Sequence, residues 1–205
     1  MQSAAQVNLQ KLVLASNNQG KLREFEHLLA PLGIAVFTQS QFNVAEAEEP
    51  HPSFVENALA KARHAAQQTG LPALADDSGL CMNALAGAPG VLSARYATLF
   101  GHDKSDANNN AALLDAMSGH TDRRGFYYCA LVLVRSAEDP IPLIAEGRWH
   151  GELLMAPLGQ GGFGYDPLFY LPALKVTAAQ LTAEQKNLLS HRALAMQDLL
   201  KKLSA

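Results

Sequence analysis

Cysteine is scarce in this chain, and its arrangement forms no motif. Only Cys81 and Cys129 occur among 205 residues, and they do not form a Cys-x-x-Cys pair. A disulfide-stapled secreted domain would need more cysteines, and a redox or zinc site would need closer spacing. We therefore expect two buried, unreactive thiols in a protein of a reducing compartment.

Neither an excess of positive charge nor a long apolar run is present. The formal net charge is −3 and no segment is polybasic. This argues against broad binding to nucleic acid but leaves room for a local basic pocket that holds a small anion. The first ten residues lack the regions of a signal peptide, and no apolar run is long enough to span a bilayer. We expect a cytoplasmic protein with no nucleic-acid or membrane partner.

The seven histidines are scattered and include no His-Glu-x-x-His motif. A zinc site therefore has little support, and any bound metal should have oxygen ligands. The composition is otherwise ordinary, with 48% hydrophobic and 17% charged residues. A chain of this length can bury a substantial core, as one domain or as two closely joined lobes.

Strand and helix patterns alternate along the chain. Residues 11–15 form a predicted buried strand that leads into a helix, and a capping box at residues 53–56 begins a second helix. Two β-rich runs at residues 126–134 and 141–149 predict a hairpin. A last helix is predicted over residues 182–203. Because an antiparallel pair interrupts an alternating chain, the predicted class is α/β, with a mixed central sheet flanked by helices.

The acidic pair Asp76 and Asp77 is the most informative local feature. It follows the apolar run 71–75, and we expect a turn there before a strand at residues 80–84. Adjacent carboxylates repel, so a fold that holds them together usually supplies a divalent cation or a shared proton. The alternative is an exposed turn in which both carboxylates bond to the backbone. Further acids lie nearby at Glu46, Glu48 and Glu49.

The segment Ser16–Lys21 lies where the first predicted strand gives way to a helix. Free backbone N–H groups and the helix dipole would favour an anion there, and Lys21 adds positive charge. The segment is not a Walker P-loop, because Leu22 follows the lysine in place of Ser or Thr. The alternative is an ordinary helix-entry turn with a solvated lysine.

A glycine-rich loop spans Gly161–Pro167, with Phe163 between glycines. Glycines allow the backbone to approach a ligand closely, and the aromatic ring offers a flat face for a nucleobase. The alternative is a tight structural loop whose phenylalanine joins the core.

Further donors come from His191 and Arg192 inside the last predicted helix, and from Lys61 and Lys186. These side chains suit carbonyl oxygens or phosphates. A lone helical His-Arg is usually a surface pair, and single lysines are usually solvated.

Taken together, the motifs resemble the inosine triphosphatase family, the non-canonical purine NTP pyrophosphatases. The segments that carry the resemblance are Ser16–Lys21, Phe54–Asn57, Lys61–Arg63, Ala75–Gly79, Gly87–Gly90, Ser93–Tyr96, Gly161–Pro167 and Ser190–Arg192. The resemblance implies hydrolysis of dITP, ITP and XTP to the monophosphate and pyrophosphate, dependence on Mg²⁺, and a homodimer. It also implies an elongated mixed α/β sheet with two lobes around a substrate cleft. We expect this domain at residues 11–203, after a short N-terminal extension at residues 1–10.

The resemblance also assigns roles to residues. Asp77 would be the catalytic carboxylate and a metal ligand, with Asp76 and either Glu48 or Glu49 supporting the metal. Phosphate or substrate contacts would come from Ser16, Asn17, Asn18, Gln19, Gly20, Lys21, Lys61 and Ser78. Phe163 would stack on the purine, and the other nucleoside contacts would come from Gly164, Tyr165, Asp166, Lys186, His191 and Arg192.

One motif departs from the family pattern, and two alternative functions remain open. The first motif commonly reads Thr-Gly-Asn, whereas Ser16 and Asn17 stand here in place of Thr and Gly. Asparagine tolerates left-handed backbone geometry, so the loop shape can survive. The alternatives are a non-catalytic purine-nucleotide sensor and a pyrophosphatase for modified pyrimidine triphosphates.

Overall fold

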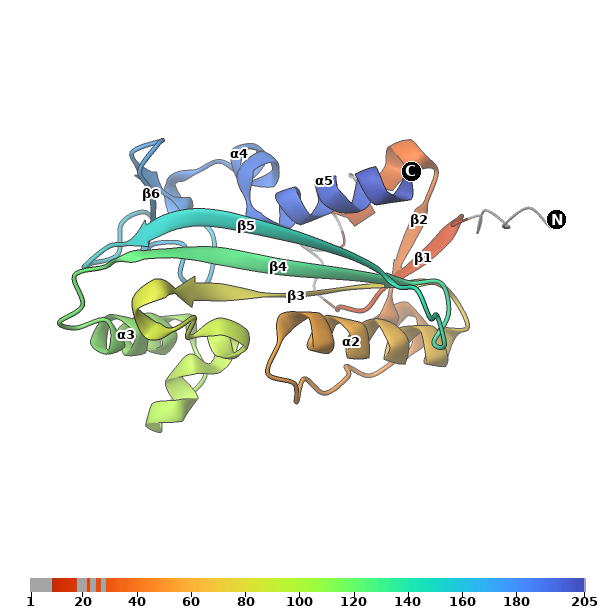
Figure 1. Cartoon of the computed structure of the whole chain (residues 1–205), viewed down its shortest axis with the longest axis horizontal. Helices are drawn as coiled ribbons and strands as arrows, with labels where there is room; N and C mark the ends of the chain where they lie inside the picture. The colour runs from red at the N-terminus through yellow and green to blue at the C-terminus, as the bar shows by residue number, and fades with distance from the viewer. Residues whose placement is uncertain (1–8, 18–21, 23–24, 27–28, 205) are drawn as a thin grey trace. The chain divides into compact units, whose positions relative to one another are not determined.

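The computed structural model describes residues 9–17, 22, 25–26 and 29–204, which divide into two compact units (Figure 1). Unit 1 contains the described residues up to Asp77, Ala130–Ala145, and the described residues from Lys202 onward. Unit 2 contains Ser78–Cys129 and Glu146–Lys201. The earlier expectation of one domain at residues 11–203 stays a prediction.

The strands form a mixed sheet in the order β2-β1-β3-β4-β5-β6-β7. They are β1 (Lys11–Leu14), β2 (Ala35–Thr38), β3 (Ala73–Met82), β4 (Arg124–Val134), β5 (Leu143–Leu153), β6 (Phe169–Leu171) and β7 (Val176–Thr177). The α-helices are α2 (Phe54–Thr69), α3 (Asp106–Ala116), α4 (Ala183–Leu189) and α5 (His191–Leu203). Short 3₁₀ helices span Ala30–Leu32, Gln39–Phe42, Asn83–Leu85, Gly90–Phe100 and Ala178–Gln180. The predicted α/β class with a mixed sheet flanked by helices is confirmed.

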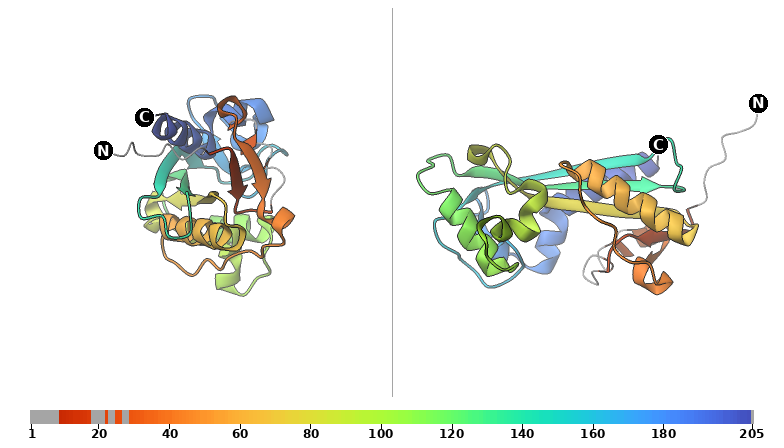
Figure 2. Two further views of the ribbon diagram at one scale, coloured as in Figure 1. Left: turned by 90° about the vertical axis from the view of Figure 1, so that its right-hand side faces the viewer. Right: turned by 90° about the horizontal axis from the view of Figure 1, so that it is seen from below.

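In unit 1, β1 pairs in parallel with both β2 and β3. Its apolar run from Leu12 to Leu14 is fully buried, as expected for a central parallel strand covered on both faces. Helix α2 lies along one face of these strands (Figures 1 and 2). The buried face of α2 includes four alanines, whose small side chains let the helix lie close to the sheet: Ala58, Ala62, Ala65 and Ala66.

The ends of α2 follow the sequence prediction. Ser53 Oγ accepts a hydrogen bond from the Glu56 N–H at 3.3 Å and donates one to the Glu56 carboxylate at 2.6 Å. The helix ends at Gly70, which takes a left-handed φ of 67°. The first predicted helix is described only in part. Leu22, Phe25, Glu26 and Leu29 are helical, and the intervening residues lie outside the described ones.

Asp139 fixes the loop between β4 and β5. Its buried carboxylate accepts hydrogen bonds from the Arg135 N–H at 2.9 Å and the Ile141 N–H at 3.0 Å. It also accepts from the Arg135 guanidinium, with both nitrogen–oxygen distances at 2.8 Å. The loop of the predicted hairpin is therefore held by a side chain that bonds residues near both of its ends.

In unit 2, apolar side chains from the strands and helices gather into one core. Strand β3 contributes Leu80, α3 contributes Leu113, and β5 and β6 contribute Trp149 and Phe169. No helix in the described part of the chain is both long enough and apolar enough to cross a bilayer.

Two predictions about local structure are wrong. The expected turn at Asp76 and Asp77 does not exist, because β3 runs continuously from Ala73 to Met82. The expected single helix over residues 182–203 is two helices, because Ser190 takes extended angles of φ −67° and ψ 161° between α4 and α5. Ser190 Oγ instead accepts from the Ala193 N–H at 3.3 Å in the first turn of α5.

We predict that Asp139→Asn lowers the free energy of unfolding by about 1–3 kcal/mol at pH 7, because charge-assisted bonds to two backbone N–H groups are weakened. The Arg135 side chain is partly exposed, so the ion pair itself contributes little. The hydrogen bonds hold the pKa of Asp139 below its usual range. The contribution of the Asp139 charge to the unfolding free energy is therefore complete above the unfolded-state pKa of about 4. It is lost progressively as the pH falls from that value through the lower pKa of the folded state.

Urea denaturation of both proteins at pH 7 and near pH 3 measures this effect. The difference in unfolding free energy between wild type and variant should be smaller at the lower pH. A gap that stays constant would show that Asp139 acts through packing rather than charge.

Candidate active site

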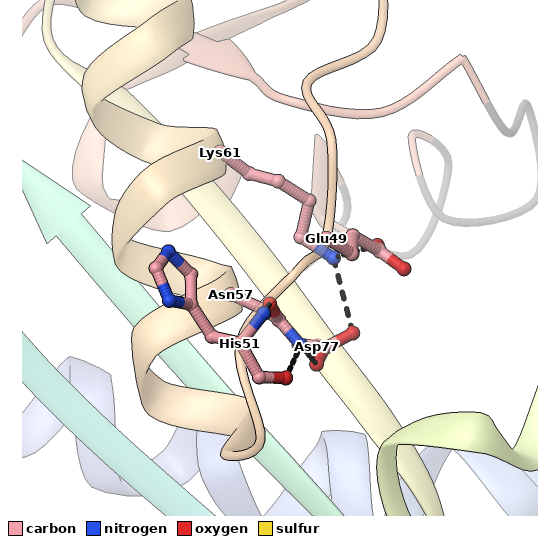
Figure 3. Close-up of polar contacts among 5 residues, drawn as sticks. All are labelled: Glu49, His51, Asn57, Lys61 and Asp77. Atoms are coloured by element: carbon pink, nitrogen blue, oxygen red, sulfur yellow. Dashed lines mark hydrogen bonds and ion pairs between the residues drawn. The ribbon is translucent and has the colours of Figure 1, made fainter.

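The acidic pair lies inside β3 and is buried. Asp76 is 2% and Asp77 is 8% exposed, so the alternative of an exposed turn is wrong. The Lys61 ammonium, from α2, lies 3.1 Å from Asp77 Oδ1 and 2.7 Å from Glu49 Oε1 (Figure 3). The structure therefore brings together three of the predicted site residues. Lys61 is not a solvated surface lysine.

Burial and neighbouring charges shape the protonation of this cluster. Desolvation raises the pKa of Asp77, and Glu49 raises it further, while Lys61 and Asn57 oppose the shift. Burial alone would lower the pKa of Lys61, but Asp77, Asp76 and Glu49 together raise it. Two carboxylates that disfavour each other's charge are thus stabilised by one ammonium group.

The cluster fits a hard divalent cation. No group of three His, Cys, Asp or Glu side chains able to hold a metal occurs among the described residues. Mg²⁺, however, commonly takes only one or two protein carboxylates and completes its shell with phosphate oxygens and water. Glu49 and Asp77 converge on one cationic group, whereas Glu48 is exposed. Between the two glutamates left open by the sequence, Glu49 is the one in the cluster.

Only part of the predicted phosphate segment can be placed. Ser16 follows β1 and its N–H donates to the Leu14 carbonyl at 2.8 Å. Asn17 donates from Nδ2 to Glu46 Oε1 at 3.2 Å. The predicted contacts at Asn18, Gln19, Gly20 and Lys21 lie outside the described residues.

Unit 2 contains a cavity of about 140 Å³ lined by the predicted nucleoside-binding residues. A water molecule takes about 30 Å³ of liquid volume, so the cavity has room for a ligand larger than a few waters. The predicted residues that line it are Ser78, residues 163–166, Lys186, His191 and Arg192.

Asp166 organises the glycine-rich loop on one side of the cavity. Its Oδ2 accepts from the Phe163 N–H at 2.9 Å and pairs with the Lys186 ammonium. Gly162 has a φ of 74°, and a Cβ there would lie 2.1 Å from the same carboxylate oxygen. Only glycine leaves room for this arrangement.

Phe163 is not a core residue. Its side chain is 63% exposed, and the Lys186 ammonium lies 4.5 Å from the centre of its ring. The alternative of a structural loop with a buried phenylalanine is therefore wrong. An exposed aromatic face beside a cavity is suited to stacking on a planar ligand.

Two further residues hold this loop, and neither is among the site residues predicted from the sequence. Asp106 Oδ2 accepts from the Gly164 N–H at 2.7 Å, and Asn110 Nδ2 donates to the Gly164 carbonyl at 2.9 Å. Both side chains lie in the first turns of α3, one helical turn apart. No local pattern reveals them, because their partner is more than fifty residues away in the sequence.

His191 and Arg192 begin α5 and are buried, so the alternative of a surface pair is wrong. The imidazole ring of His191 stacks on Tyr127, with ring centres 4.8 Å apart and planes 13° apart. Burial and the nearby carboxylate of Asp166 raise the pKa of Tyr127 well above its usual value. Tyr127 is therefore a neutral phenol at physiological pH.

A comparison with protein families decides the relationship. The model of the Ham1 family matches residues 12–202. This chain belongs to the Ham1 family. The Ham1 assignment confirms the resemblance predicted from the motifs.

Several Ham1 relatives are similar over nearly their whole length. A dITP/XTP pyrophosphatase of Bordetella pertussis is 63% identical, with 97% of this chain and 93% of the relative covered. One of Ralstonia nicotianae is 61% identical, covering 95% and 97%. Among solved structures, a HAM1 protein from Coxiella burnetii has a TM-score of 0.90 at 47% identity, covering 95% of this chain and 98% of that one.

The first turn of α5 lies directly on β5, as Figure 1 shows for the two elements. A Cβ at Gly147 would lie 2.0 Å from the His191 carbonyl oxygen and 2.5 Å from the Ala195 nitrogen. We predict that Gly147→Ala displaces this turn and lowers the free energy of unfolding by about 1–3 kcal/mol.

Trp149 is the only tryptophan and lies 6.5 Å, ring to ring, from His191. Its fluorescence should shift to longer wavelength in the Gly147→Ala variant. Glu152→Ala, at an exposed position of the same strand, is the matched control and should leave the emission unchanged. An unshifted spectrum with wild-type stability in Gly147→Ala would contradict the close approach.

Proposed function

We propose that this Ham1 chain hydrolyses non-canonical purine nucleoside triphosphates, namely dITP, ITP and XTP or dXTP. The products would be the nucleoside monophosphate and pyrophosphate, so the enzyme would remove these nucleotides from the cellular pool. The observation that carries the proposal is the buried Asp77 carboxylate, bonded to Lys61 beside Glu49. The names of the relatives supply the substrate class.

The reaction joins a water oxygen to the α-phosphorus and breaks the bond from that phosphorus to the oxygen bridging it to the β-phosphorus. Asp77 would orient the water and accept its proton, a role that suits a carboxylate whose pKa is raised. Lys61 would stabilise negative charge on the phosphates. A bound Mg²⁺, held by Asp77 and Glu49 with support from Asp76, would neutralise charge on the triphosphate and the departing pyrophosphate.

The cavity in unit 2 favours a purine that presents oxygen rather than amino groups. Its two carboxylates, Asp106 and Asp166, already accept backbone N–H groups of the loop, and Asp166 also pairs with Lys186. Its donors include His191 and Arg192. An amino group of adenine that faced these donors would leave them unpaired, and unpaired buried donors are costly. Hypoxanthine and xanthine present a 6-oxo group, and xanthine adds a 2-oxo group.

Other assignments belong to the same proposal. Ser16 and Asn17 with residues 18–21 would bind the triphosphate, and Ser78 would contact the substrate. Residues 164–166 would line the nucleoside pocket, with Lys186, His191 and Arg192 near the base. We also propose Mg²⁺ as the physiological metal, a homodimer, and a cytoplasmic location.

Pyrophosphate release from dITP, XTP, dGTP, dATP and dUTP, with Mg²⁺ present and then chelated, tests the function. Release should require the metal and be confined to dITP and XTP. Asp77→Asn, which keeps the side-chain shape but removes the charge, should abolish turnover while leaving the fold intact. Wild-type turnover in that variant would contradict the role of Asp77. Binding of ITP without any release would favour a sensor, and release from dUTP a pyrimidine enzyme.

We predict that Phe163→Ala raises the KM for dITP about 5- to 150-fold with little change in kcat. Base–aromatic stacking contributes roughly 1–3 kcal/mol. Because Phe163 is mostly exposed, its removal should leave the unfolding free energy within about 0.5 kcal/mol of wild type. Leu158→Ala removes another exposed apolar side chain of unit 2 and serves as the control for general surface effects. A KM equal to that of wild type would rule out stacking on Phe163.

A further inference from the structure

Asn57 is a buried carboxamide that contacts the acidic cluster. It lies in the first turn of α2 and is 1% exposed. Its Oδ1 accepts from the His51 N–H at 2.9 Å, and its Nδ2 donates to the His51 carbonyl at 3.1 Å and to Asp77 Oδ2 at 3.3 Å (Figure 3). An amide nitrogen has two hydrogens, so both donors of Asn57 have partners.

These bonds join three separate segments of unit 1. Asn57 belongs to α2, Asp77 belongs to β3, and His51 belongs to the loop between the 3₁₀ helix Gln39–Phe42 and α2. The carboxamide bonds His51 through both its N–H and its carbonyl, as a neighbouring strand would. Since Glu49 lies two residues before His51, the path of the loop determines where the Glu49 carboxylate lies.

The two oxygens of Asp77 have different partners as a result. Lys61 contacts Oδ1, and Asn57 contacts Oδ2. A carboxylate bonded at both oxygens cannot rotate freely about its Cβ–Cγ bond, so its plane is set. Aspartate at position 57 could not donate to Asp77 and would add a further negative charge to those of Asp76, Asp77 and Glu49. An alanine could make none of the three bonds.

We propose that Asn57 is a positioning residue of the active site. Its carboxamide orients the Asp77 carboxylate and fixes the loop that carries Glu49, so that both carboxylates face one position. This inference rests on the proposed function, because the position is the one assigned to the metal and the triphosphate. Partners that orient metal-ligating carboxylates typically change metal affinity or activity by 10- to 100-fold when they are removed.

The experiment compares Asn57→Ala with Asn109→Ala. Asn109 is also buried, and it also bridges backbone groups, accepting from the Ala97 N–H at 2.9 Å and donating to the Ala94 carbonyl at 3.2 Å. It contacts no carboxylate in these bonds. Both variants should therefore lose stability, but only Asn57→Ala should lose positioning.

For Asn57→Ala we expect kcat for dITP to fall about 10- to 100-fold and the Mg²⁺ concentration for half-maximal rate to rise by a similar factor. The KM for dITP should change by less than about twofold, since the base contacts are intact. Hydrogen–deuterium exchange should become faster at the His51 amide, whose acceptor is removed. Asn109→Ala should keep the wild-type kcat and Mg²⁺ requirement.

Asn57→Asp provides a second variant that keeps the size of the side chain and the acceptor for the His51 N–H. We expect hydrogen–deuterium exchange at the His51 amide to be slower in Asn57→Asp than in Asn57→Ala, while kcat is still reduced. This result would separate the hold on the loop from the orientation of Asp77. Equal kcat losses in Asn57→Ala and Asn109→Ala, or wild-type kcat in both Asn57 variants, would overturn the inference. An inactive wild type would instead contradict the proposed function, and the exchange at His51 would still report whether Asn57 holds the loop.

Discussion

The burial of two adjacent carboxylates inside a strand is the constraint on which unit 1 depends. A carboxylate removed from water is costly unless it is paired and hydrogen-bonded. Helix α2 supplies both kinds of partner to Asp77, an ammonium from Lys61 and a carboxamide from Asn57. The cap at Ser53 fixes where α2 begins, and its alanine face lets the helix lie close to the parallel strands. Together these features place the Lys61 and Asn57 side chains beside Asp77.

Unit 2 combines an apolar core rich in aromatic side chains with a cavity that is bordered by the glycine-rich loop. A loop rich in glycine has few side chains that can hold its shape. Here the holding hydrogen bonds come from Asp166 within the loop and from Asp106 and Asn110 of α3. These bonds also engage one carboxylate oxygen each of Asp106 and Asp166, two residues that line the cavity. The groups that shape the loop therefore also set the polarity that a ligand meets.

Much of this architecture follows from sequence patterns, because periodicity and caps are local. The helix beginning at Ser53, the hairpin closed near Asp139 and the mixed sheet were all predictable in this way. A turn was expected at Asp76 and Asp77 because a charged pair normally ends a buried strand. This prediction is wrong. Only a partner on another element, here Lys61, allows β3 to continue through the pair.

The site was predictable where a motif carried the chemistry and unpredictable where a contact spanned distant segments. Lys61, Asp77 and Phe163 stand out by residue type and by the family motifs. Asp106 does not, since its partner lies 58 residues away in the sequence. Asn57 belongs to one of the family motifs, but the motif does not reveal its contact with Asp77, 20 residues away. An asparagine in the first turn of a helix reads as ordinary until its neighbours in space are known.

The interruption at Ser190 has a consequence for how the pocket can diversify. Because the backbone leaves helical geometry at Ser190, Lys186 lies in α4 and His191 lies in α5 rather than in one continuous helix. An insertion or deletion within α4 would rotate Lys186 by about 100° per residue, yet the register of His191 on β5 would be untouched. Lys186 and His191 both line the cavity of unit 2 but lie on separate helices, so a substitution can change the position of one without moving the other.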